Sequence, residues 1–123
     1  MIINIARDYT ETPGGRNISD GNFSGEDFRD NFLIPKIGGL IDSDEKIEIN
    51  LDGGYGYGSS FLEEAFGGLI RKLVLKNISV NNIRAFINRF HIKSDEEPAL
   101  VSQIFEYMER AIEEGSKKWL KRY

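Results

Sequence analysis

Residues 47–70 read IEINLDGGYGYGSSFLEEAFGGLI and contain the strongest structural signals in the chain. Every second residue from Ile47 to Leu51 is apolar, which is the pattern of a strand with one buried face. Four glycines within residues 53–58 then predict a loop. Apolar side chains recur at helical spacing from the end of the loop to Val74. A strand, a glycine-rich loop and an amphipathic helix therefore follow one another directly.

The predicted helix begins at Ser59 and Ser60. Ser60 and Glu63 have the spacing of a capping box, in which a hydroxyl and a carboxylate satisfy free backbone N–H groups. Gly67 and Gly68 fall in the middle of the helix, where each costs about 1 kcal/mol relative to alanine. A close approach of the helix backbone to a neighbouring element would explain that cost.

The rest of the chain alternates between expected strands and helices. Its elements are a strand over residues 1–6, a polar loop over residues 8–25, a helix that Ser24 caps and Pro35 kinks or ends, a helix over residues 83–90 capped by Ser79 or Asn81, a strand over residues 91–93 and a last helix that begins within residues 94–97. A strand over residues 83–87 is the alternative to the second of these helices. The order predicts an α/β fold, a small sandwich in which about four helices pack on a mixed β-sheet.

The length of 123 residues predicts a single domain over residues 1–123, with residues 115–123 as a tail. Gly115 is expected to weaken or end the last helix. In the alternative arrangement, Trp119, Leu120 and Tyr123 fold back onto the core.

The charge pattern argues against nucleic acid as a partner. The formal net charge is -4, whereas binding to phosphates requires clustered lysines and arginines. The one basic cluster, at residues 117–122, is interpreted as a solvated tail or a last helical turn. No apolar run approaches the roughly 18 residues of a membrane helix, and the N-terminal residues do not resemble a secretory leader. We therefore expect a cytoplasmic protein without a membrane segment.

The sequence offers no metal or cofactor site. It contains no cysteine, which excludes disulfides, thiolate nucleophiles and cysteine-ligated metals. Residues 42–45 carry oxygen ligands but lack the remaining positions of a calcium loop. The glycine-rich loop is not followed by the Lys-Ser or Lys-Thr pair of a phosphate-binding loop. We expect neither a metal ion nor a cofactor.

Ser60 is the candidate functional residue. A helix that starts directly after a glycine-rich loop presents free backbone N–H groups and positive potential, and a hydroxyl there faces solvent. Phosphorylation would add about -1.5 to -2 charges, which the helix tolerates and a partner surface senses. The alternative is that Ser59 and Ser60 only cap the helix and that the glycines only form a flexible turn.

Residues 47–70 resemble the STAS-like family of unknown function (DUF4325). Gly15-Arg16 and the stretch Ser24-Gly-Glu-x-Phe28-Arg29 resemble that family as well. The resemblance extends from about residue 14 to residue 112 and implies a STAS-like sandwich. Related STAS domains, the anti-sigma factor antagonists, carry Asp-Ser-Ser-Gly-Leu at a helix start, and a kinase partner phosphorylates the second serine. Here Gly58 replaces the aspartate and Phe61 replaces the glycine, while Ser60 falls at the phosphorylated position.

The resemblance implies a regulatory protein-binding module rather than an enzyme. Its partner would be a histidine-kinase-like ATPase or an anti-sigma factor, and its oligomeric state is left open. The expected contact residues are Gly54, Tyr55, Gly56, Tyr57, Gly58, Ser59, Ser60 and Arg16, with Ser60 as the switch. Arg16 is included because, if it lies near Ser60, it could hold a phosphate or a partner carboxylate.

Two other functions remain open. A sensor of a small ligand, nucleotide or anion would bind at the loop formed by residues 53–60. A hydrolase would combine Ser60 with His91, the only histidine, although no nucleophile-elbow pattern surrounds Ser60. Glu63 and Glu64 are adjacent in sequence, so we expect them to point in different directions rather than to form an acid–base pair.

Overall fold

Three short parallel strands form the sheet of the computed structural model, which describes residues 1–121 and the side chains of residues 1–115. The strands are β1 (Ile2–Asn4), β2 (Ile47–Asn50) and β3 (Phe90–Lys93), in the order β1-β2-β3. Their register aligns Ile3 with Ile49 and Ile49 with Ile92. The α/β class predicted from sequence is confirmed, but the sheet is parallel throughout and not mixed.

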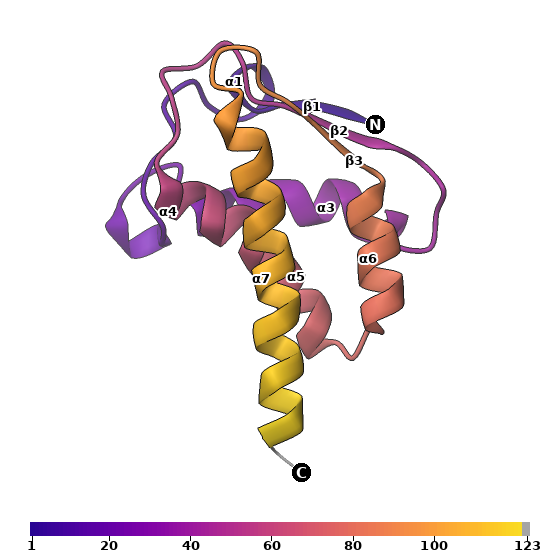
Figure 1. Cartoon of the computed structure of the whole chain (residues 1–123). Helices are drawn as coiled ribbons and strands as arrows, with labels where there is room; N and C mark the ends of the chain where they lie inside the picture. Colours follow the sequence, from indigo (N-terminus) through magenta and orange to yellow (C-terminus); the bar gives the residue numbers. More distant parts are fainter. Residues whose placement is uncertain (122–123) are drawn as a thin grey trace.

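Apart from the short helix that follows the first strand and lies at the end of the strands, the labelled helices lie on one face of the sheet (Figure 1). The helices are α1 (Ile5–Asp8), α2 (Gly25–Asp27), α3 (Ile34–Ile37), α4 (Ser59–Leu62), α5 (Gly68–Leu75), α6 (Val80–Asn88) and α7 (Ala99–Lys121), together with π-helical segments η2 (Phe28–Leu33) and η4 (Glu63–Gly67) and 3-10 turns η1 (Ile18–Asp20) and η3 (Gly38–Leu40). The alternation of side chains along the strands explains this arrangement, because the residues between the buried isoleucines face away from the helices. Glu48 and His91 are paired in register on that open face.

The segments α4, η4 and α5 form one continuous helix over residues 59–75. All of the predicted apolar stripe except Val74 is fully buried, and it forms the centre of the core. Phe61 packs against Phe28 of η2, with ring centroids 5.7 Å apart. The helix therefore begins at the end of the glycine-rich loop and is fixed in place by its buried face.

Two helix starts agree with the sequence, since the hydroxyls of Ser24 and Ser79 accept hydrogen bonds from Asp27 N–H and Asn82 N–H. Pro35 was expected to kink or end the helix; it does not end it, because the helix continues through it to Ile37. Ile34 N–H donates to the carbonyl of Arg29, five residues back, so the helix is already in the wider π-helical register where the proline enters.

The two ends of the chain also differ from expectation. The first strand stops at Asn4, whose side chain caps α1, so the strand predicted over residues 1–6 is shorter. Gly115 does not end α7; it allows the side chain of Val74 to pack closely where a Cβ atom would overlap it. The expected packing of Trp119, Leu120 and Tyr123 lies outside the described side chains. No helix in the described part of the chain is long and apolar enough to cross a membrane.

Candidate functional site

The glycine-rich loop of residues 53–58 connects β2 to α4 at the carboxyl end of the parallel strands, where the β3–α7 connection also lies. Gly53 and Gly56 have φ angles of +98° and +109°, a region that favours glycine. Tyr55 N–H donates to the carbonyl of Glu11 at 2.9 Å, and a Cβ atom at Gly54 would lie 3.0 Å from the same oxygen. The glycines therefore shape a loop of fixed conformation.

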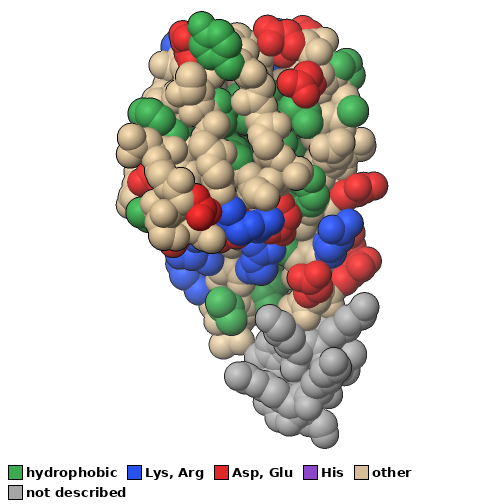
Figure 2. Space-filling model, turned by 90° about the vertical axis from the view of Figure 1, so that its left-hand side faces the viewer, with side chains coloured by type: hydrophobic (Ala, Val, Ile, Leu, Met, Phe, Trp, Pro, Cys, Tyr) green, Lys and Arg blue, Asp and Glu red, His purple; other side chains and the backbone are tan. Residues whose placement is uncertain are grey.

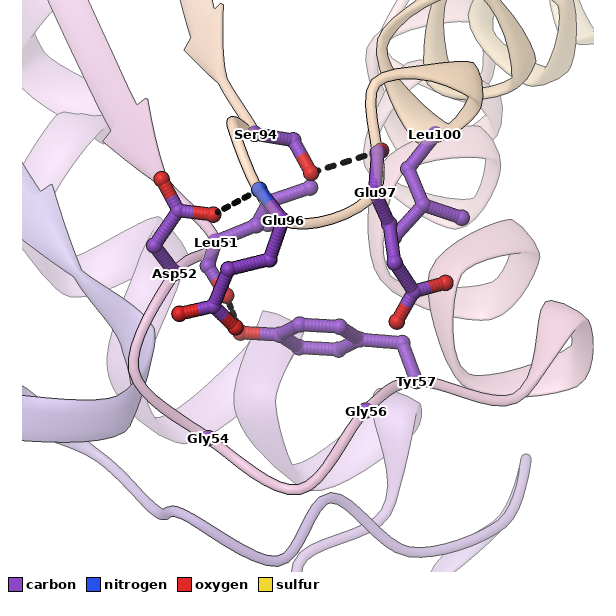
Figure 3. Close-up of a pocket in the computed structure, with 9 residues that line it drawn as sticks. All are labelled: Leu51, Asp52, Gly54, Gly56, Tyr57, Ser94, Glu96, Glu97 and Leu100. Atoms are coloured by element: carbon purple, nitrogen blue, oxygen red, sulfur yellow. Dashed lines mark hydrogen bonds between the residues drawn. The ribbon is translucent and has the colours of Figure 1, made fainter.

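The loop and residues 94–97 enclose a shallow hollow with acidic walls (Figure 3). The carboxylate of Asp52 accepts hydrogen bonds from Asp95 N–H at 3.0 Å and Glu96 N–H at 2.9 Å. These bonds lower the pKa of Asp52. In the opposite direction, the carboxylate of Glu96 accepts a hydrogen bond from Gly53 N–H at 3.1 Å. The two connections are thus tied together by their own carboxylates.

The two loop tyrosines have different roles. Tyr55 is 82% exposed and stands free on the surface. Tyr57 is half-buried, and its hydroxyl donates to the carbonyl of Leu51 at 3.0 Å. Burial, together with the charges of Asp52 and Glu96, raises the pKa of Tyr57. Tyr55 is thus available for contact, whereas Tyr57 anchors the loop.

Ser59 and Ser60 are both exposed in the first turn of α4. The helix is capped by Gly58, with an extended backbone and no side-chain hydrogen bond. The capping box predicted for Ser60 and Glu63 is therefore wrong, because Ser60 is already the second helical residue. The reading of both serines as caps fails for the same reason.

Arg16 reaches this helix directly after its first turn. Its Nη1 atom lies 2.6 Å from Glu63 Oε1 and 3.1 Å from Glu64 Oε2. Arg71 binds the same two carboxylates, at 2.6 Å from Glu63 Oε2 and 3.3 Å from Glu64 Oε2. Glu63 and Glu64 therefore do not diverge as predicted. They lie in the π-helical segment η4, whose wider turn separates successive residues by a smaller angle than an α-helix does.

Arg29 is the buried arginine of this network and binds Glu64 and Asp30. Its Nη1 atom donates to the carboxylate of Glu64 at 2.8 Å and to the carbonyl of the same residue at 3.0 Å, while its Nε atom binds Asp30 at 2.8 Å. A Cβ atom at Gly68 would overlap Arg29 Nη1. The close approach predicted at the mid-helix glycines is confirmed at Gly68, but the neighbour is an arginine side chain.

The charges in the network stabilise one another. Burial raises the pKa of Glu63, but the hydrogen bonds from Arg71 and Arg16 outweigh it and leave that pKa lowered. Burial likewise disfavours charged Arg29, and its contacts with Asp30 and Glu64 raise its pKa in spite of that. Figure 2 shows basic and acidic side chains side by side in a band across this side of the molecule.

Arg29, Arg71 and Asp30 belong to the network but were not predicted from the sequence as site residues. Glu63 and Arg71 are eight residues apart on one helix, which is not the three- or four-residue spacing that indicates an ion pair in a sequence. Arg29 carried no local signal either, because its partner is 35 residues distant.

His91, the partner that a Ser60-dependent hydrolase would need, does not lie beside Ser60. His91 is exposed on the sheet face that points away from the helices, whereas Ser60 belongs to a helix packed on the opposite face. Among the described residues, no group of three or more His, Cys, Asp or Glu side chains could hold a metal ion.

The parallel sheet and the helices packed on it define a small α/β domain. A family model described as the STAS-like domain of unknown function (DUF4325) matches residues 24–98. The match covers more than half of the chain, and the chain belongs to this family. Gly15 and Arg16 lie outside the matched residues. Among curated proteins and among solved structures, the comparisons found no match.

Proposed function

We propose that the chain is a regulatory protein-binding module and that phosphorylation of Ser60 changes its affinity for a partner. The observation that carries the proposal is the exposed Ser60 hydroxyl, which follows a loop of fixed conformation and does not cap its helix. Because this hydroxyl is exposed and does not cap the helix, another protein can reach it. The module itself performs no catalysis.

Phosphorylation requires a kinase partner that holds a nucleoside triphosphate. Ser60 Oγ attacks the terminal phosphorus, the bond to the bridging oxygen breaks, the hydroxyl proton passes to a base of the kinase, and the nucleoside diphosphate leaves. The start of the helix over residues 59–75 favours the added negative charge. Because nucleoside triphosphates are cytoplasmic substrates, this chemistry belongs to the cytoplasm.

The contact surface of the proposed module combines Ser60 with Tyr55. An exposed tyrosine supplies a large contact area and loses little conformational freedom on binding. Its backbone is already fixed by the hydrogen bond to Glu11, which lowers the cost of ordering the loop. The partner class is the one that the family resemblance implies, a histidine-kinase-like ATPase or an anti-sigma factor.

Binding of Ser60 variants tests the proposal. A partner found by affinity capture and mass spectrometry would be purified and titrated against the unsubstituted chain, Ser60→Asp and Ser60→Ala. Ser60→Asp should weaken the complex and Ser60→Ala should not, while Ser102→Asp, an exposed serine on α7, serves as the matched control. Equal affinity of all four chains would end the proposal.

The anion sensor is the weaker alternative. The carboxylates of Asp52, Glu96 and Glu97 line the hollow beside the loop and would repel an anion there. A thermal-shift titration with inorganic phosphate and nucleotides tests it, since a bound ligand would raise the melting temperature.

A further inference from the structure

Arg16 is the most exposed of the three arginines in the network, and the carboxylates can spare it. Its side chain is 38% exposed, against 34% for Arg71 and 7% for Arg29. If its guanidinium leaves, Glu63 retains Arg71 at 2.6 Å, and Glu64 retains Arg29 at 2.8 Å. Each carboxylate would therefore keep a counterion, and departure of Arg16 would not leave a half-buried negative charge unpaired.

Ser60 lies on the side of the helix that Arg16 already touches. Glu63 and Glu64, the two partners of Arg16, follow Ser60 by three and four residues. Side chains at these separations are neighbours on a helix surface, with Cβ atoms about 5–6 Å apart. A guanidinium that is held by both glutamates therefore lies on the same side of the helix as Ser60, and contact with a group carried by Ser60 requires the Arg16 side chain to swing back toward the first turn.

We propose that Arg16 is the intramolecular receiver of the Ser60 phosphate. When Ser60 is phosphorylated, the guanidinium moves from the carboxylates of Glu63 and Glu64 to the phosphate oxygens. This inference rests on the proposed function, because it describes what the same site does after modification.

The exchange is favoured by charge and by geometry. A phosphate monoester carries about -1.5 to -2 charges and three acceptor oxygens, and an arginine fork binds such a group through two parallel hydrogen bonds. The present contacts of Arg16 place a single nitrogen, Nη1, between two carboxylates. The phosphate thus offers Arg16 a more highly charged partner and a bidentate one.

The movement is confined to the side chain. The backbone around Arg16 is fixed, because Gly25 N–H donates to the carbonyl of Gly15 at 2.9 Å and Glu26 N–H donates to the carbonyl of Arg16 at 3.0 Å. The phosphorylated surface therefore differs from the unmodified one in charge and in the position of one guanidinium, with the surrounding loop unchanged. A partner that requires Ser60 uncovered would meet a phosphate that Arg16 has partly screened.

Phosphorus NMR of the chain with phosphoserine installed genetically at position 60 tests the inference. Glu63, Glu64, Arg16 and Arg71 all face this part of the helix. Because the other three remain in Arg16→Gln, the difference between the two titrations isolates Arg16. We expect the second pKa of the phosphate to be about half a unit or more higher in Arg16→Gln, since that variant lacks the stabilising cation. Arg84→Gln, which removes an exposed arginine paired with Glu109, should leave the pKa unchanged.

A second measurement needs no substitution at Arg16. The Nε–H resonance of Arg16 should shift between the unmodified and the phosphorylated chain, and that of Arg84 should not. An unshifted Arg16 resonance, or equal phosphate pKa values with and without Arg16, would overturn the inference. Neither measurement involves a partner, so this failure would leave the switch at Ser60 standing. Conversely, a partner that ignores the phosphate would refute the switch and leave the Arg16 contact intact.

Discussion

Gly68→Ala should destabilise the protein, although the same change in an ordinary helix would stabilise it. Gly68 has φ and ψ angles of -61° and -36°, which alanine adopts without strain, so helix propensity alone predicts a gain of about 1 kcal/mol. The added Cβ atom would overlap Arg29 Nη1, however, and Arg29 is nearly buried and has little room to move.

The size of the effect follows from the contacts that Arg29 would lose. Its Nη1 atom donates to the carboxylate and to the carbonyl of Glu64. A hydrogen bond to a charged group contributes about 1.5–3 kcal/mol, so the disturbance outweighs the gain in propensity. We expect Gly68→Ala to lower the free energy of unfolding by about 1–2 kcal/mol.

A double-mutant cycle in urea measures this coupling. In the Arg29→Ala background the space beside residue 68 is free, and Gly68→Ala should then stabilise by about 1 kcal/mol. The change of sign corresponds to a coupling of about 2–3 kcal/mol between the two positions. Gly39→Ala is the matched control, because a Cβ atom there meets no atom within 4 Å. If Gly68→Ala stabilised both backgrounds equally, the assignment of Gly68 to the arginine would be refuted.

Three further predictions concern the loop at the carboxyl end of the sheet. Gly53→Ala and Gly56→Ala should each cost about 1–2 kcal/mol in urea unfolding, because both φ angles are positive, whereas Gly58→Ala, in an extended conformation, should cost less. Tyr57→Phe should cost about 1 kcal/mol by removing the hydrogen bond to Leu51, and Tyr55→Phe, at an exposed position, should cost nothing measurable. The lowered pKa of Asp52 means that its stabilising effect is present above the unfolded-state pKa and is lost as pH falls through the folded-state value. The difference between the unfolding midpoints at neutral and acid pH should therefore be smaller in Asp52→Asn than in the unsubstituted chain, and an unchanged pH dependence would refute that assignment.

The central part of the fold could be predicted because its signals are local and strong. The alternation up to Leu51, the glycines after it and the apolar stripe beyond Ser60 each have one dominant reading. The caps at Ser24 and Ser79 were predictable for the same reason, since a cap contacts residues only three positions away. The parallel pairing of the strands was not predictable, because it joins segments more than 40 residues apart.

The charged network could not be predicted from local spacing. Glu63 was assigned to the helix cap because Ser60 precedes it by three residues, but Gly58 is the cap and the carboxylate binds Arg16 and Arg71 instead. The π-helical turn of η4, which allows Glu63 and Glu64 to share partners, depends on packing between helices. Buried Arg29 was not anticipated either, because its position becomes meaningful only when Gly68 is seen to make room for it.

The switch at Ser60 is tested by isothermal titration calorimetry of the partner against the chain with and without phosphoserine at position 60. Our account predicts that the dissociation constant differs between the two forms by about tenfold or more, which corresponds to about 1.4 kcal/mol. The same dissociation constant for both forms, with a fully occupied phosphorylation site, would contradict it.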